Sequence, residues 1–147
     1  MRDNQPSSRT VDLLVGGTFA IAMSALLVRA ALRCFGADLM SLATAVQDDS
    51  FYYLVPAFLF HEHGFPTFDG IHPTYSGQPG FMAFLMLLAT PFRDLESFFR
   101  AALFANHLLL AVGSILAVVL VRRIARPFGA ARAALSGWTA GALLGLN

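Results

Sequence analysis

The chain has 147 residues, of which 56% are hydrophobic and only 13% are charged, and its formal net charge is +1. A soluble domain of this size cannot bury so much apolar surface, so the composition predicts an integral membrane protein. The near-neutral charge and the lack of a basic stripe argue against a nucleic-acid partner. All ten basic residues are arginines, and the single cysteine, Cys34, rules out an internal disulfide.

The first predicted transmembrane helix covers residues 12–32. Residues 13–28 carry no charged side chain, and Arg29 and Arg33 follow, where long side chains can reach toward an interface. A cleaved signal peptide is the alternative, since its basic start and apolar centre are similar. The apolar stretch is long for that purpose and the sequence around Arg29 is a poor cleavage site, so we favour a retained anchor.

Residues 33–97 are predicted to form a large external loop that contains interfacial helices. The apolar segment 80–92 would extend only roughly 20 Å as a helix, against a hydrocarbon core of about 30 Å. Pro79 precedes this segment, and Pro91 and Arg93 close it. We therefore expect an interfacial or re-entrant helix that does not span the membrane.

A second transmembrane helix is predicted at residues 98–121, because the apolar stretch is long enough to cross and ends in a group of arginines. A cytoplasmic turn at 122–132 and a third transmembrane helix at 133–147 follow. Glycines recur every four residues in this last helix and would share one face suited to helix partners: Gly137, Gly141 and Gly145. A Gly/Ala-rich span without specific contacts is the alternative.

The expected fold is therefore an all-α membrane protein with about three transmembrane helices and interfacial helices in a large first external loop. With the amino terminus inside, six of the ten arginines are cytoplasmic and four are outside. A flipped orientation in which segment 80–92 spans gives the same count, so the length of that segment decides the topology. Because three helices are few for a membrane enzyme, we expect the amino-terminal portion of something longer.

The most informative stretch is the acidic pair Asp48 and Asp49, which precedes a run of aromatic and aliphatic residues. Two adjacent like charges beside an apolar surface repel each other, so one carboxyl group should have a raised pKa unless a cation compensates. Such a group can act as a general base toward a hydroxyl. In the alternative, one acid only caps a helix that begins at Phe51, which Pro56 kinks or ends, and the aromatic residues form an interfacial belt.

Other loop residues offer positive charge or hydrogen-bond donors. Arg100 lies at the outer end of the second span, and His72 lies in the same loop. His61 and His63 have a spacing seen in metal sites, but no closed set of ligands accompanies them, so we predict no zinc site. No cofactor is certain. A divalent metal remains possible, since two neighbouring aspartates suit either case.

Three sequence stretches carry a family resemblance. They are Gln47-Asp48-Asp49-Ser50-Phe51-Tyr52-Tyr53-Leu54, then Glu62-His63-Gly64-Phe65, then Thr67-Phe68-Asp69-Gly70 with His72-Pro73-Thr74. Together they resemble the first external loop of bacterial GT-C membrane glycosyltransferases. The stretch from Phe99-Arg100 to Arg122-Arg123 is similar to the span that follows in that superfamily.

The resemblance implies transfer of a sugar from a polyprenyl-phosphate donor to an acceptor outside the bacterial cytoplasmic membrane. It assigns Asp48 as the base or the acceptor-orienting group, with Asp49 beside it, and Arg100 to the lipid phosphate. Tyr52, Tyr53 and His72 are the remaining candidates for substrate binding. The partners expected are the lipid-linked sugar and membrane lipid. A noncatalytic membrane assembly or transport subunit, in which the acids bind a cation or cap a helix, is the alternative.

Overall fold

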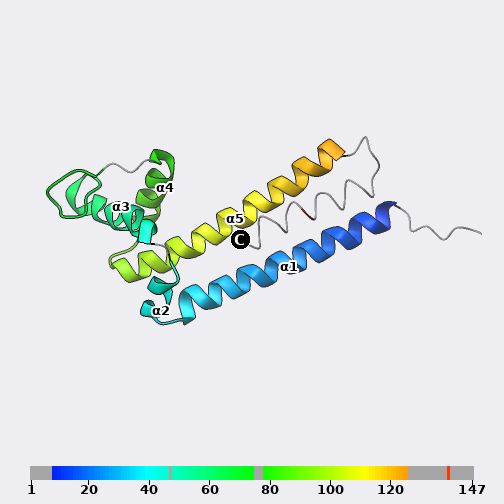
Figure 1. Cartoon of the computed structure of the whole chain (residues 1–147), viewed down its shortest axis with the longest axis horizontal. Helices are drawn as coiled ribbons and strands as arrows, with labels where there is room; N and C mark the ends of the chain where they lie inside the picture. The colour runs from blue at the N-terminus through cyan, green and yellow to red at the C-terminus, as the bar shows by residue number, and fades with distance from the viewer. Residues whose placement is uncertain (1–7, 47, 75–77, 126–138, 140–147) are drawn as a thin grey trace, which may run out of the picture. The chain divides into compact units, whose positions relative to one another are not determined.

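The computed structural model describes residues 8–46, 48–74, 78–125 and 139 (Figure 1). Every regular element in these ranges is a helix, and the β-type pairing described is one isolated antiparallel bridge between Thr67 and Pro73. The chain divides into two compact units, Met1–Ala30 with Asn106–Asn147, and Ala31–Ala105. Each unit is described separately below.

Two long helices provide most of the first unit. Helix α1 covers Ser8–Gly36 and helix α5 covers Leu95–Ala125. Their apolar stretches of 24 and 30 residues are long enough to cross a membrane, and only 6% and 11% of the most apolar windows are buried. The core helix of a soluble protein would hide far more of its surface.

The predicted spans at 12–32 and 98–121 fall on these two helices, which are compatible with a membrane protein. The cytoplasmic turn predicted from residue 122 starts within α5, which continues to Ala125. The third predicted span, 133–147, and its glycine face lie outside the described residues, apart from Thr139.

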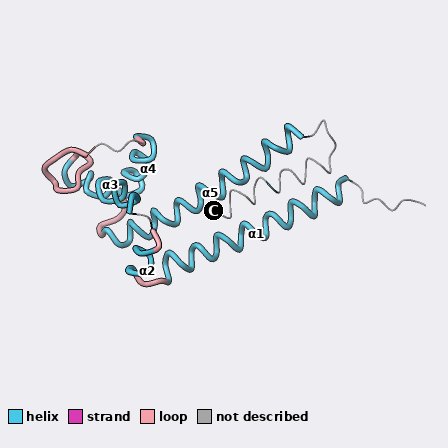
Figure 2. The backbone as a smooth tube through the Cα atoms, viewed as in Figure 1, coloured by secondary structure: helices cyan, strands magenta, loops and turns pink. Residues whose placement is uncertain are grey.

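The second unit contains four short helical elements between the ends of α1 and α5. These are α2 (Leu39–Thr44), the 3-10 turn η1 (Asp48–Ser50), α3 (Phe51–His63) and α4 (Pro79–Ala89). Helices α3 and α4 pack against each other (Figure 1), and Figure 2 shows the loop that follows α3. We call residues 37–94 the connecting segment. Its described residues, 37–46, 48–74 and 78–94, include helices that pack together.

One hydrophobic core holds this unit together, and it draws on α2, α3, α4 and the first turns of α5. Its buried members are Leu42, Leu54, Ala57, Met82, Leu85, Ala89, Phe98, Phe99 and Ala102. Phe98 is fully buried and its ring stacks on that of Phe58 at a centroid distance of 5.8 Å. Because α5 supplies three of these residues, the connecting segment and the second long helix share one core.

Side-chain caps mark where two of the helices begin. The Asp38 carboxylate accepts a hydrogen bond from the Ser41 amide at 2.9 Å before α2, and Asp94 accepts one from the Ser97 amide at 2.7 Å before α5. The bonds with Ser41 lower the pKa of Asp38, and those with Ser97 lower the pKa of Asp94. Both carboxylates therefore act as ionised helix caps.

Proline 56 does not end the helix in which it lies. Helix α3 continues through Pro56 to His63, so of the two predicted outcomes, a kink or an end at Pro56, the end is wrong. The ring is fully buried, and it lies near the start of the helix, where few preceding turns are disturbed. Burial of the ring offsets the hydrogen bond that Tyr52 loses, since proline has no amide hydrogen to donate to that carbonyl.

Helix α4 is the short apolar helix predicted at 80–92, although it ends earlier, at Ala89. Pro79 stands in its first turn, as its fixed φ angle and missing amide hydrogen allow. With 11 residues it extends about 17 Å, too short to cross a membrane.

Candidate functional site

The acidic pair lies in η1, immediately before α3. The side chain of Asp49 is exposed, whereas that of Asp48 is outside the described part of the structure. Ser50 has helical backbone angles, φ −65° and ψ −31°, and makes no side-chain cap bond, so η1 runs directly into α3. No hydrogen-bond or ion-pair partner is found for Asp49 among the described residues. Its carboxylate caps nothing there and is open to a ligand.

The two tyrosines that follow point to different neighbours, as consecutive residues on a helix must. Tyr52 is 60% exposed, and its ring packs edge to face with Phe68 at 5.6 Å. Tyr53 is partly buried, and its ring meets Phe81 of α4 at 5.7 Å. Tyr52 therefore faces the loop after α3 and remains accessible, while Tyr53 belongs mainly to the packing of α3 on α4.

The loop after α3 is organised around Asp69. Its Oδ1 accepts hydrogen bonds from the amides of Ile71 and His72, both at 2.8 Å, and from the buried Thr67 hydroxyl at 3.0 Å. The same hydroxyl accepts the amide of Gly70 at 3.0 Å. Short polar side chains that bond nearby amides are typical of tight turns. This turn fixes the backbone on which His72 stands.

Asp69 also fixes the imidazole of His72. The distance from His72 Nδ1 to Asp69 Oδ2 is 2.7 Å. This bond, followed by those from the backbone amides of His72 and Ile71, holds the pKa of Asp69 far below its usual range. An ionised carboxylate only accepts hydrogen bonds, so Nδ1 carries the proton and Nε2 is left for another partner. The His72 side chain is 80% exposed, so that nitrogen can reach a ligand.

Glycine 70 allows this turn to pack on His63. Its φ angle is +74°, in the left-handed region, and an added Cβ would lie 2.9 Å from Cε1 of His63. The His63 ring thus packs against the turn and has a structural role. His61 is also structural: its Nε2 donates to the carbonyl of Met86 at 2.9 Å and ties α3 to α4.

Most of the hydrogen bonds that the Arg100 side chain can donate go to other groups of this chain. Its Nη1 donates to the carbonyls of Cys34 and Ala37, at 2.8 and 2.9 Å, and its Nε and Nη2 donate to Oε1 of Glu96, at 3.0 and 2.8 Å. These bonds use four of the five guanidinium hydrogens, and the side chain is only 15% exposed. Arg100 therefore caps the end of α1, and one Nη2 hydrogen remains for a ligand.

An apolar groove lies beside the acidic turn. Its volume is ≈ 210 Å³, and its lining residues are Leu39, Ala43, Phe51, Leu54, Val55, Leu95, Glu96 and Phe99. Phe51 directly follows η1, and Glu96 is the partner of Arg100. Apart from Glu96, every lining residue is apolar, which suits a hydrocarbon chain better than a sugar.

Contacts link only some of the candidate residues to one another in the described part of the chain. Asp49, Tyr52 and His72 have exposed side chains in the connecting segment, and Tyr52 contacts the loop that carries His72 through Phe68. The hydrogen bonds and the ion pair described for Arg100 go to Cys34, Ala37 and Glu96 and to none of these three. No group of three or more His, Cys, Asp or Glu side chains within the described ranges is arranged to hold a metal ion.

Thr67 and Asp69 organise the site but were not among the residues singled out for it from sequence. The Thr-Phe-Asp-Gly stretch carries a turn signal that could have identified them. Comparison with known proteins adds nothing here, because the chain matches no protein-family model, no curated protein and no solved structure. The sequence resemblance, together with the residues and geometry described above, is therefore the basis for a functional proposal.

Proposed function

We propose that the chain carries the sugar-transfer site of a GT-C type membrane glycosyltransferase that uses a polyprenyl-phosphate donor. The observation that carries the proposal is the exposed and unpartnered carboxylate of Asp49 in η1. The connecting segment joins two consecutive helices long enough to cross a membrane, and if both cross it, the segment lies on one side of the bilayer, close to lipid. A donor with a long isoprenoid chain needs a site in that position.

In the proposed reaction, the oxygen of an acceptor hydroxyl attacks the anomeric carbon of the donor. The bond from that carbon to the phosphate oxygen breaks, and polyprenyl phosphate leaves. The hydroxyl proton passes to the carboxylate of Asp48, with Asp49 beside it orienting the acceptor.

Other residues of the connecting segment have supporting roles in this proposal. The exposed ring of Tyr52 offers an apolar face and a hydroxyl to a sugar, and Nε2 of His72 offers a hydrogen-bond partner. The groove that includes Phe51 would take the first isoprene units. Arg100 contributes chiefly by holding α1 to α5, with its remaining Nη2 hydrogen directed to the lipid phosphate.

The test is transfer from a labelled polyprenyl-phosphate sugar by the intact chain in phospholipid vesicles. Asp48→Asn is expected to reduce the rate by about 10²–10⁴-fold, the usual contribution of a general base. Asp38→Asn and Asp94→Asn are matched controls, because asparagine caps a helix about as well as aspartate. These two variants lose one carboxylate each and should keep full activity.

Full activity of Asp48→Asn would exclude the base role. If the native chain neither transfers sugar nor retains polyprenyl phosphate, the transferase proposal fails and a noncatalytic membrane subunit becomes the better interpretation. The proposed location, a bacterial cytoplasmic membrane with the connecting segment outside, has its own test. Thr44 is exposed, so a cysteine placed there should react in intact cells with a reagent that cannot cross the membrane.

A further inference from the structure

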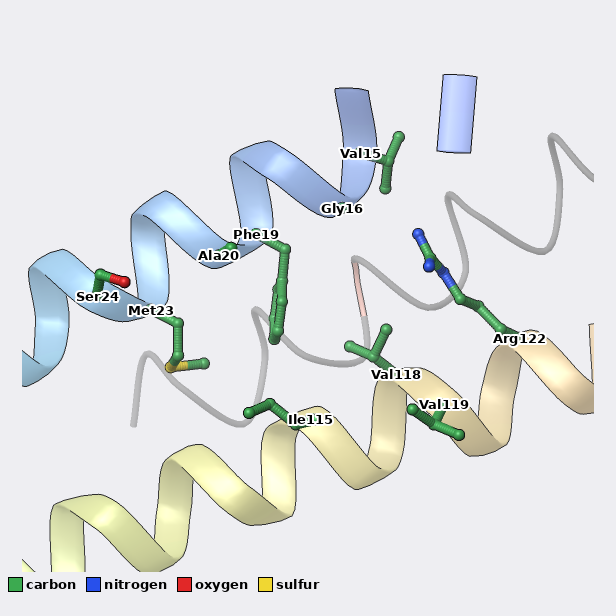
Figure 3. Close-up of a pocket in the computed structure, with 10 residues that line it drawn as sticks. All are labelled: Val15, Gly16, Phe19, Ala20, Met23, Ser24, Ile115, Val118, Val119 and Arg122. Carbon is green, nitrogen blue, oxygen red and sulfur yellow. The ribbon is translucent and has the colours of Figure 1, made fainter. Parts of the chain in front are cut away.

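A second cavity lies within the first unit, between α1 and α5, and has a volume of ≈ 380 Å³ (Figure 3). Its walls come from residues 15–24 of α1 and residues 115–122 of α5. On α1, Gly16, Ala20 and Ser24 are spaced four apart and share one face. Small side chains on such a face usually let helices pack closely, but here they border an open apolar slot.

Arg122 is the one charged residue among those that line the slot. Figure 3 shows its guanidinium extending from α5 toward Val15 and Gly16 of α1. The Nε atom is buried and has no hydrogen-bond partner among the described residues. A buried donor without a partner is costly, and more so when it belongs to a charged group. An anion bound beside Arg122 would therefore be stabilised in the slot.

The rest of the slot has apolar walls that suit a hydrocarbon chain. Phe19 and Met23 project from α1 toward α5, and Ile115 and Val118 project from α5 in the opposite direction (Figure 3). A free inorganic anion would gain nothing from these walls, and a purely apolar ligand would leave the arginine unpaired. A molecule with a phosphate at one end and a hydrocarbon chain satisfies both parts.

We infer that the slot binds one anionic phospholipid, with its phosphate on Arg122 and one acyl chain along Gly16, Ala20 and Ser24. Guanidinium hydrogens form paired bonds with phosphate oxygens, which a lysine ammonium does not reproduce. Arg122 lies at the end of α5 opposite the connecting segment. In the proposed orientation this end meets the cytoplasmic leaflet, whose anionic lipids carry the negative surface potential.

This inference goes beyond the transferase proposal and does not depend on it. The residues that line the slot belong to the first unit, and none of them is a candidate catalytic or sugar-binding residue. Loss of sugar transfer would leave the lipid site unaffected, and loss of the lipid site would not exclude the reaction.

The experiment measures lipid bound to the purified full chain by native mass spectrometry. Phosphatidylglycerol and phosphatidylcholine with identical acyl chains are compared. Both carry the same phosphate, but the choline ammonium cancels the net negative charge of phosphatidylcholine, so we expect one phosphatidylglycerol to be retained at least about tenfold more tightly. Inorganic phosphate at millimolar concentration should not displace it. This comparison uses the wild-type chain and needs no variant to fold.

Two matched pairs of variants locate the site. Arg122→Gln should weaken phosphatidylglycerol binding about tenfold, whereas Arg123→Gln, which removes the same charge from an exposed neighbour outside the slot, should change it little. Ala20→Leu should block the acyl chain, whereas Ala22→Leu adds the same bulk at an exposed position that does not line the slot.

Three results would overturn the inference. The first is equal retention of the two lipids by the wild-type chain. The second is equal loss from Arg122→Gln and Arg123→Gln, which would indicate a diffuse surface charge. The third is unchanged binding in Ala20→Leu, which would mean that the slot holds no acyl chain. Helical circular dichroism and a monodisperse elution profile confirm that each variant is folded.

Discussion

Replacing Arg100 by glutamine gives a sharp test of how the connecting segment is held to the long helices. The change removes two bonds from Nη1 to the carbonyls of Cys34 and Ala37 and two bonds to Glu96. Glu96 is half exposed, so its pairing with Arg100 resembles a surface pair four residues apart on a helix, which contributes about 0.5 kcal/mol. The carbonyl bonds dominate the expected effect.

Each hydrogen bond from a charged donor contributes about 1.5–3 kcal/mol. Taking the lower value for each of the two carbonyl bonds gives a minimum, because the Arg100 side chain is only 15% exposed and solvent weakens its bonds little. Arg100→Gln should therefore cost about 3 kcal/mol of local stability, which corresponds to an opening constant raised roughly 100-fold. Glu96→Gln, the matched control, should raise it only about twofold.

Amide hydrogen exchange measures this effect directly. Residues 38–46 follow the end of α1 that Arg100 caps, so their protection factors should fall about 100-fold in Arg100→Gln while those of α3 change less. Unchanged protection at 38–46 would refute the capping role. An equal loss in Glu96→Gln would also refute it, because the ion pair and not the carbonyl bonds would then carry the stability.

Three further predictions concern the second unit. Gly70→Ala should destabilise the loop by about 2 kcal/mol, because a residue with a Cβ is strained at this left-handed φ angle and its Cβ would also clash with His63. Gly64 has a similar φ angle but open space around it, so Gly64→Ala should cost only about 1 kcal/mol. Chemical denaturation measures both losses of stability. Hydrogen bonds lower the pKa of Asp69 in the folded state, so they stabilise the loop fully at pH values above the unfolded pKa of about 3.9, and this stabilisation is lost as the pH falls toward the folded pKa. Amide protection in the loop should therefore fall in acid, and Asp69→Asn should abolish this pH dependence. Phe98→Ala should cost about 3–5 kcal/mol by chemical denaturation, since the ring is fully buried, and a loss below about 1 kcal/mol would contradict the packing described.

Features that depend on length and apolar content were predictable from sequence. Long uncharged stretches indicated α1 and α5, and the shortness of α4 indicated that it cannot cross a membrane. The structure confirms two helices long and apolar enough to cross a membrane and a third apolar helix that is shorter. Pro56 does not end its helix as one of the two predicted outcomes had it, because its tolerance depends on burial of the ring, which no local pattern reports.

The candidate site was predictable only in part. Asp49, Tyr52 and His72 were identified as residues, but the bond from His72 to Asp69 and the buried hydroxyl of Thr67 follow from turn geometry that the sequence only hints at. The hydrogen bonds of Arg100 show more clearly what sequence cannot predict. Its carbonyl partners are 63 and 66 positions away, and a backbone carbonyl has no residue identity that a sequence pattern can reveal.

The shared core has a consequence for the order of events during synthesis. Phe98, Phe99 and Ala102 belong to α5 and complete the core that the connecting segment begins. While the ribosome is still adding residues 37–94, that core lacks these side chains and the cap that Arg100 places on α1. The acidic turn can therefore reach its final setting only after the first turns of α5 have left the ribosome, so maturation of the segment is coupled to delivery of the second long helix.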